Sequence, residues 1–339
     1  MRPLHLPLAA ALAALLLAPA ALPQERSEIE KEIHDWGESV AKKIEIQESA
    51  DVPAWAVRPG EPRFRFVQIA DIHLTPAKEE LLKSALRYVS TEVRPAFVVL
   101  TGDNTSIYSI EGHRRLKAIL DEELTCPYHA VRGDNDARNF WVVFGSTHWS
   151  FDYGGVHFVG SGLDRDIETV GIGTFSEETW EWLRDDLARS SGRPTLYLQH
   201  EPCLPPTFLD APRLALLLSA RRNVVGVLNG HLHYDLEFRL AKPHLSAIAL
   251  GQNPRHGIKV YSVYPDGIVA QTHVLDGESF RAARIFQRID FPERLRLSGD
   301  EPLEISDRRE LPAAPMVFDE ELKERYDELR LWLKRFDSK

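Results

Sequence analysis

The stretch Phe66-Val67-Gln68-Ile69-Ala70, followed by Asp71-Ile72-His73, begins a pattern that occurs five times in this chain. Each time, a short apolar run typical of a buried strand ends in residues that bind metal ions. The other four are Phe97–Thr101 before Gly102-Asp103-Asn104, Tyr128–Arg132 before Gly133-Asp134-Asn135-Asp136, Thr195–Gln199 before His200, and Val224–Asn229 before Gly230-His231-Leu232-His233. Ligands in open α/β sheets lie outside the carboxyl ends of the strands. The pattern therefore predicts one sheet edge that gathers carboxylates and imidazoles.

The side chains at these strand ends form a mixed set of oxygen and nitrogen donors. They are three carboxylates and four imidazoles: Asp71, Asp103, Asp134, His73, His200, His231 and His233. Seven donors are too many for one tetrahedral ion, so they favour two ions that share a bridging carboxylate. Mixed N/O ligation suits Mn, Fe or Zn better than Ca or Mg. Two such ions lower the pKa of a bridging water and hold the oxygens of a phosphoryl group.

The ordered series D-x-H, G-D, G-D-N-D, H and G-H-x-H resembles the calcineurin-like metallophosphoesterases over about residues 64–275. The resemblance implies a two-sheet β sandwich flanked by helices. It also implies a binuclear metal centre and the hydrolysis of a phosphodiester or phosphomonoester by a metal-activated hydroxide. By position, the first ion would bind Asp71, His73 and His233, and Asp103 would bridge. The second would bind His200, His231 and Asp134. The segments Phe151–Phe158 and His200-Glu201-Pro202 resemble the class III cyclic-nucleotide phosphodiesterase branch.

Two positions depart from the family pattern G-N-H-D/E. Asp134 stands at the family Asn and adds negative charge. Asn135 stands at the family His, and an amide cannot act as a general acid, a role that typically contributes about 10²–10⁴-fold in rate. We therefore expect an acidic leaving group, a replacement donor such as Asp136 or water, or poor turnover. Arg138 is a candidate for binding the substrate phosphate, because guanidinium pairs well with phosphate oxygens.

Purple acid phosphatases are a less favoured alternative within the same fold. They place a Tyr ligand three residues after the Asp of the second block, where this chain has Ser106. They also lack the histidine that corresponds to His73. The sequence therefore favours the other metallophosphoesterases.

The composition gives no indication of nucleic-acid binding. The chain has 339 residues, 43% of them hydrophobic, and a formal net charge of −10 without any long Lys/Arg block. It therefore lacks the basic footprint of a nucleic-acid-binding protein. We expect a small phosphate ester to be drawn to the bound cations instead.

The first 22 residues predict an export signal. Arg2 precedes the apolar run Leu8–Leu17, and Ala18-Pro19-Ala20 is a small-residue cleavage site. The run is short for a membrane span. We expect a secreted or periplasmic protein with no stable membrane span after cleavage, and an uncleaved membrane anchor is the alternative.

The remaining chain divides into three predicted parts. Residues 23–63 form an amphipathic helix and a connector, residues 64–290 the metallophosphoesterase domain, and residues 291–339 an extension with an amphipathic helix. Within the domain, alternating strands and helices predict a parallel sheet with crossover helices. The hairpin Trp149–Val159 and the later strands at 236–240, 245–250, 258–264 and 268–273 predict a second, more antiparallel sheet.

The other cysteines and histidines are expected to be structural. Cys126 and Cys203 are placed at opposite strand ends, so we expect no disulfide. His157 lies within a strand and is expected to be a satisfied core histidine. Surface positions are expected for His113, His129, His148, His244, His256 and His273.

The sequence thus predicts an exported binuclear phosphoesterase, with a catalytic centre that includes Asp103, Asn135 and Asp136. Asn135 motivates a second hypothesis, a weakened or inactive protein that binds metal and phosphate. A third is a structural or partner-binding protein acting through its terminal helices, whose apolar stripes also leave oligomerisation open.

Overall fold

The computed structural model describes residues 45–106, 109–136, 139–166, 173–203, 208–240, 242–252, 255–318, 321–322 and 324–325. The predicted signal peptide, the amphipathic part of the N-terminal segment, Arg138 and most of the C-terminal helix lie outside these residues. Within the described chain, no helix combines the length and the apolar character needed to cross a bilayer.

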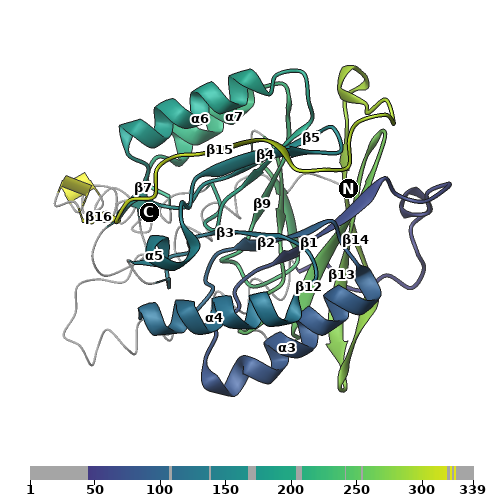
Figure 1. Ribbon diagram of the computed structural model, residues 1–339. Coiled ribbons are helices and arrows are strands. Elements are labelled where there is room, and N and C mark those ends of the chain that lie inside the picture. Colours follow the sequence, from purple (N-terminus) through teal and green to yellow (C-terminus); the bar gives the residue numbers. More distant parts are fainter. Residues whose placement is uncertain are drawn as a thin grey trace, which may run out of the picture.

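The first sheet has six strands in the order β14-β13-β12-β1-β2-β3 (Figure 1). Parallel pairing joins β1 to β2 and β2 to β3, whereas β1, β12, β13 and β14 pair antiparallel. The bounds are β1 Phe64–Ile69, β2 Phe97–Thr101, β3 Tyr128–Val131, β12 Gly257–Tyr264, β13 Gly267–Asp276 and β14 Ser279–Asp290.

The second sheet has seven strands in the order β10-β11-β9-β8-β5-β4-β15. Its centre, β11-β9-β8-β5, is parallel, and its edges are antiparallel. The bounds are β4 Trp149–Tyr153, β5 Val156–Gly160, β8 Thr195–Leu198, β9 Val224–Asn229, β10 Leu236–Arg239, β11 Pro243–Ser246 and β15 Ser306–Glu310. A small third sheet joins β16 Val317–Phe318, β6 Arg165–Asp166 and β7 Gly173–Thr174.

Helices cover the outer face of each sheet, which gives an α/β/β/α layering (Figure 1). On the first sheet, α3 (Glu79–Tyr88) and α4 (Ile110–Glu123) pack against the outward side chains of β1 and β2. On the second sheet, α6 (Glu177–Arg189) and α7 (Ala211–Ala220) pack against the outward side chains of β5, β8 and β9. Ser176 begins α6 as an N-cap, since its side chain accepts a hydrogen bond from the Thr179 N–H. The shorter helical segments are η1 Ala54–Ala56, η2 Pro76–Lys78, η3 Val89–Val93, α5 Phe140–Phe144 and η4 Glu293–Leu295.

The main core lies between the two sheets. Alternation along β1 sends Phe64 and Phe66 inward and Val67 and Ile69 toward the helices. Phe66 stacks on Tyr261 with ring centroids 4.5 Å apart. Phe66 also meets Phe158 of the second sheet, with ring centroids 5.2 Å apart. Contacts of this second kind hold the two sheets face to face, so that the carboxyl ends of their parallel strands meet at one rim.

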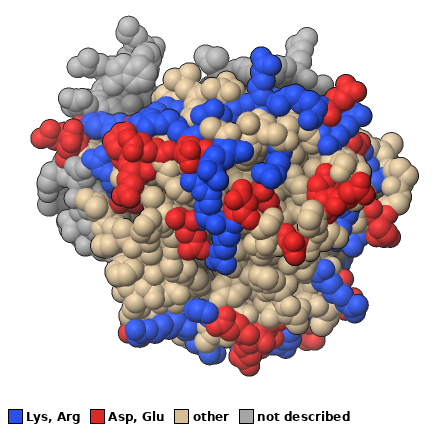
Figure 2. Space-filling view, turned by 45° about the horizontal axis from the view of Figure 1, so that its top comes forward, with Lys and Arg blue, Asp and Glu red and all other residues tan. Residues whose placement is uncertain are grey.

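Charged side chains of both signs share the outer face of α6. Figure 2 shows Lys and Arg interspersed with Asp and Glu on the face seen when the top of Figure 1 is turned forward. Arg213 pairs with Glu177 at 2.6 Å, and Arg309 of β15 pairs with Asp185 at 2.8 Å. Strand β15, which the sequence assigns to the C-terminal extension, therefore joins the second sheet and packs against α6.

The predicted β sandwich is confirmed. The sequence predicts one sheet led by parallel pairing and one more antiparallel. The structure has two parallel and three antiparallel pairings in the first sheet and three of each in the second. Both sheets are mixed, because each has parallel strands linked by helical crossovers and antiparallel hairpin strands at an edge. Within the described chain, β14, β15 and α7 had no prediction. The apolar run Leu214–Leu218 of α7 carries no polar face from which helical periodicity could be read.

The two cysteines are free, as predicted. The surface positions expected for several histidines are wrong. Four are buried, with exposed fractions of 0% to 8%: His113, His129, His148 and His244. His157 is a satisfied core residue as predicted, since its ring contacts Asp152 at 2.7 Å and Asp186 at 2.8 Å.

Candidate metal centre

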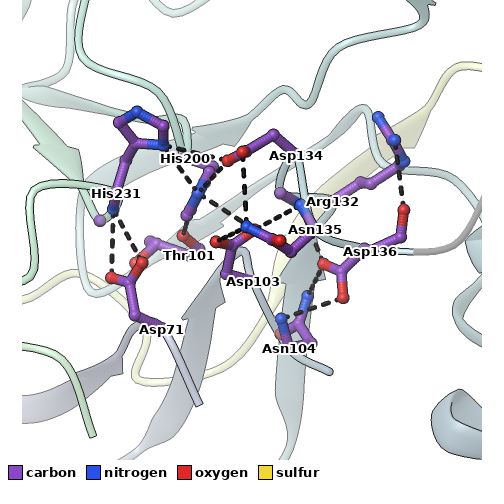
Figure 3. Close-up of polar contacts among 12 residues, drawn as sticks. Asp71, Thr101, Asp103, Asn104, Arg132, Asp134, Asn135, Asp136, His200 and His231 are labelled. Carbon is purple, nitrogen blue, oxygen red and sulfur yellow. Dashed lines mark hydrogen bonds and ion pairs between the residues drawn. The ribbon is translucent and has the colours of Figure 1, made fainter. Parts of the chain in front are cut away.

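The ends of β1, β2, β3, β8 and β9 converge and bring all seven predicted donor side chains together. They form two groups, within each of which the donor atoms all lie within 4.8 Å of one another. One group is Asp71, His73, Asp103 and His233, and the other is Asp134, His200 and His231. Figure 3 shows Asp71, Asp103, Asp134, His200 and His231 turned toward one another from separate strand ends.

In the first group, two carboxylates face two imidazoles. His73 Nε2 lies 3.3 Å from Asp103 Oδ2, and His233 Nε2 lies 3.3 Å from Asp71 Oδ1. The backbone N–H of His231 donates to both oxygens of Asp71 at 3.1 Å. The segment Gly230–His233 thereby orients the carboxylate of Asp71.

In the second group, Asp134 Oδ1 is shared by two imidazoles. It lies 2.9 Å from His200 Nε2 and 3.0 Å from His231 Nδ1. The Nδ1 of His200 is 2.8 Å from the carbonyl of Thr101 and donates to it. That contact places the lone pair of His200 on Nε2, toward the two carboxylates of the site.

Asp103 lies between the two groups. Its Oδ2 faces His73 of the first group, and its Oδ1 lies 3.2 Å from His200 Nε2 of the second. One carboxylate with an oxygen directed at each group has the geometry of a bridging ligand.

The backbone at this rim is strained. Of the seven described non-glycine residues with positive φ, five belong to the site: Asp71, His73, Asp103, His231 and His233. Such conformations cost about 1–3 kcal/mol each and cluster at functional sites. Neighbouring glycines allow the close approach of the strand ends. A Cβ on Gly102 would lie 2.5 Å from the His200 ring, and a Cβ on Gly133 would collide with the backbone nitrogen of Asp103.

The carboxylates and imidazoles of the site lie close enough to shift one another's pKa values. Burial opposes the ionisation of Asp134, but His231 and His200 outweigh it and hold its pKa well below the usual value. Burial likewise opposes protonation of His200, but Asp103, Asp134 and Asp71 raise its pKa well above the usual value. For His73 burial prevails and lowers the pKa.

The residues fit a pair of metal ions. His73 is 4% exposed, its Nδ1 lies 3.2 Å from Ser106 Oγ, and its Nε2 has no hydrogen-bond partner among the described residues. A buried nitrogen that faces two carboxylates without accepting a proton from any donor is what a metal ligand requires. The donor set of carboxylates and imidazoles suits a transition metal.

The segment Gly133–Asp136 after β3, the third motif of the series, holds the residues that depart from the family pattern. Asn135 donates its backbone N–H to Asp103 Oδ1 and its side-chain amide to Asp103 Oδ2, at 2.8 and 2.7 Å. It therefore faces the site, as expected, and holds the central carboxylate. Arg138 lies outside the described residues.

Asp136 does not fit the role of general acid that the sequence suggested. It is 2% exposed and turned away from both ligand groups, as Figure 3 shows. Its oxygens accept hydrogen bonds from Asn104, Thr105 and Gly133. These four donors join the segment Gly102–Thr105 to the segment Gly133–Asp136 through the Asp136 carboxylate. Because that carboxylate is buried among them, it cannot reach a substrate.

Sequence reasoning missed two buried residues beside the site. His113 of α4 contacts Asp136 Oδ1 at 3.2 Å, so α4 braces the third block. Glu201 is fully buried, and neither of its carboxylate oxygens has a hydrogen-bond partner within the described chain. Burial raises the pKa of Glu201 to about 7. Its position directly after His200 was the only signal in the sequence.

A family model and a similar solved structure agree with this fold. The family model described as calcineurin-like phosphoesterase matches residues 64–235, slightly more than half of the chain. A dimetal phosphatase from Danio rerio is similar in structure, with 18% identity, a TM-score of 0.54, and coverage of 68% of this chain and all of that one. A purple acid phosphatase from yellow lupin has 13% identity and a TM-score of 0.49, over 68% of this chain and 54% of that one. No curated protein sequence gives a significant match.

Proposed function

This chain belongs to the calcineurin-like phosphoesterase family, and on that premise we propose that it is an exported binuclear metallohydrolase of phosphate esters. The observation that carries the proposal is the position of Asp103, whose two oxygens face the two groups of donors. Asp71, His73 and His233 would hold one ion, and Asp134, His200 and His231 the other. Mn, Fe and Zn are the favoured metals. Bound there, two ions would lower the pKa of a water between them and neutralise charge on the phosphoryl group.

The chain's own residues suit a substrate whose leaving group departs without a strong proton donor. Asn135 occupies the family His position. Its backbone N–H and side-chain amide donate to Asp103, and the amide also donates to Asp134 at 3.4 Å. Asp136 is enclosed by backbone donors. We therefore favour esters with an acidic leaving group, and a diester over a monoester because of the hairpin resemblance at Phe151–Phe158.

The test is metal analysis of the purified protein followed by a panel of aryl phosphodiesters and phosphomonoesters. Asp103→Asn and His231→Gln should each lower metal-dependent turnover by at least a hundredfold. Asp121→Asn, a carboxylate on the exposed side of α4, is the matched control and should retain wild-type turnover. Activity that survives in both site variants would refute the assignment.

A weakened or inactive binding protein remains a second candidate, and Asn135 favours it. Proton transfer contributes about 10²–10⁴-fold in enzymes that use it. If Asn135→His raises the rate by that order, the natural protein is a weakened enzyme. High turnover of a diester by the wild type would exclude this candidate.

Export is part of the proposal and is supported by the sequence of the first 22 residues. Cell fractionation and N-terminal sequencing of the mature protein test it. A mature chain that begins near residue 21, found outside the cytoplasm, supports export. An intact N-terminus in the membrane fraction would favour the uncleaved anchor.

A further inference from the structure

A cavity of about 170 Å³ lies beside the metal centre on the same rim. Arg132 at the end of β3 forms one wall, and Leu163, three residues beyond β5, forms another. Arg132 is followed by Gly133 and then Asp134, so one residue separates this wall from the second ligand group and the two Cα atoms are two residue steps apart. At about 3.3–3.6 Å per residue, their Cα atoms are at most about 7 Å apart.

The cavity has mostly apolar walls and a fixed roof. Phe140 of α5 is 2% exposed and Leu163 is 1% exposed. The roof is the segment Leu311–Val317, which leaves β15 and enters β16. It is pinned at both ends, because Leu311 N–H donates to the His148 carbonyl at 3.1 Å and Val317 N–H donates to the Asp164 carbonyl at 2.9 Å. Two prolines within it restrict its backbone further.

One buried residue in the wall of this cavity has a ring nitrogen without a partner. His148 lines the cavity and is 4% exposed, and its Nδ1 has no hydrogen-bond partner among the described residues. Other polar walls are engaged: Arg132 Nη2 donates to the Asp136 carbonyl, Thr147 Oγ1 accepts from the Arg132 N–H, and both Asp164 oxygens accept from Ser176. The cavity therefore offers a ligand an imidazole nitrogen among mostly apolar walls, as specific small-molecule sites do.

The contacts of His148 determine what that atom can do. Thr179 Oγ1 donates its only proton to Asp164 Oδ2 at 2.6 Å, so toward His148 it can only accept. His148 Nε2 lies 3.3 Å from this oxygen and must carry the proton. In the neutral ring the lone pair is then on Nδ1, which is an acceptor. A ligand that fits has a flat apolar body and one N–H or O–H donor.

We propose that this cavity is a subsite for the organic group of the ester, and that it selects an aromatic group with a single hydrogen-bond donor. The assignment to substrate rests on the proposed function, whereas ligand binding by the cavity does not. The roof shows that the C-terminal segment, which the sequence placed outside the catalytic domain, builds part of the specificity site.

The first experiment is calorimetric binding of indole and 1-methylindole to the full chain. Indole supplies the N–H donor, and 1-methylindole has the same body without it. Wild-type protein should bind indole at least tenfold more tightly than 1-methylindole. His148→Leu should abolish that preference, and Leu163→Trp, which fills the cavity, should weaken both ligands. His244→Leu is the matched control. His244 is also buried with an unpartnered ring nitrogen, but it lies in β11, next to the edge strand β10 of the second sheet.

Thermal melting identifies any variant that fails to fold. The comparison of indole with 1-methylindole on the wild-type protein tests the subsite without any variant. No indole binding, or equal binding of both indoles, overturns the subsite.

A kinetic experiment tests the link to the substrate. Two 4-nitrophenyl phosphodiesters share a leaving group, and their second alcohol is either 2-(indol-3-yl)ethanol or methanol. The ratio of kcat/KM for the indolyl diester to that for the methyl diester should fall at least tenfold in Leu163→Trp. An unchanged ratio overturns the assignment to substrate. Indole binding without cleavage of any ester would instead refute the proposed phosphoesterase and leave the binding site in place.

Discussion

Asn135 holds Asp103 with two hydrogen bonds, one to each carboxylate oxygen, at 2.8 and 2.7 Å. One of the two residues that depart from the family pattern is thus bound to the carboxylate that faces both ligand groups. This relationship gives Asn135 a role that does not depend on proton transfer, namely to fix the direction of both Asp103 oxygens.

Asn135→Ala should weaken metal binding by about tenfold or more. The substitution removes the side-chain hydrogen bond to a charged group, which is worth about 1.5–3 kcal/mol. Metal titration followed by calorimetry measures the change. Unchanged affinity in the alanine variant would show that Asp103 needs no such support.

Gly133→Ala should abolish activity and lower the melting temperature. A Cβ at this position collides with the backbone nitrogen and the carboxylate of Asp103, so the third block has to move away from the second. Gly192→Ala is the control, since a Cβ there meets no atom within 4 Å. Thermal melting and turnover of both variants check this. Equal behaviour of the two variants would mean that the contact between the blocks is dispensable.

Stability should fall as the pH is lowered from about 6.5 toward 4. Burial lowers the pKa of His129, His244 and His273 to about 4. Between that value and the ordinary pKa of about 6.5, the unfolded chain binds more protons than the folded one. Each group contributes stability above pH 6.5, of up to about 3 kcal/mol, that is lost as the pH falls through this window. Urea unfolding of wild type and His244→Gln tests this, because the variant should show a shallower decline.

Removing His157 should cost far more stability than removing an exposed charge. Its ring joins Asp152 to Asp186, and Arg309 of β15 also binds Asp186 at 2.8 Å. Asp186 would keep Arg309 and Asp152 would keep Arg193, but both would lose the ring that joins them. Breaking a buried ionic contact costs about 3–5 kcal/mol. The expected loss for His157→Ala is of that size in urea unfolding.

Lys117→Ala is the comparison for that measurement. Lys117 pairs with Asp121 at 2.7 Å on the surface of α4, with both side chains largely exposed. An exposed pair of this kind is worth less than about 1 kcal/mol. Similar losses in the two variants would contradict the buried network.

Metal ions should stabilise the fold, and chelation should reverse the effect. Any ligand that binds only the folded state adds stability, about 2.7 kcal/mol at a concentration 100 times its Kd. We expect Mn²⁺ or Zn²⁺ to raise the melting temperature of the wild type and not that of Asp103→Asn. The same shift in both proteins would indicate binding elsewhere.

Much of the site could be predicted because its donors follow directly from local sequence. The strand runs before Asp71 and Asp103, for example, have strand periodicity and end in side chains with a single common chemistry. The role of Asp136 could not be predicted in this way. Its carboxylate is adjacent to the site in sequence but is turned inward by Asn104, Thr105 and His113, which come from other segments.

The sequence by itself determined the five strands that end in the site, the identity of the seven donor side chains and their order along the chain, because hydrophobic periodicity and side-chain chemistry are local properties. Only the tertiary structure decided which donors share a group, that Asp103 faces both groups, and that Leu311–Val317 closes a cavity beside them. These are contacts between segments far apart in the chain. They depend on how two mixed sheets pack face to face, which no short stretch of residues encodes.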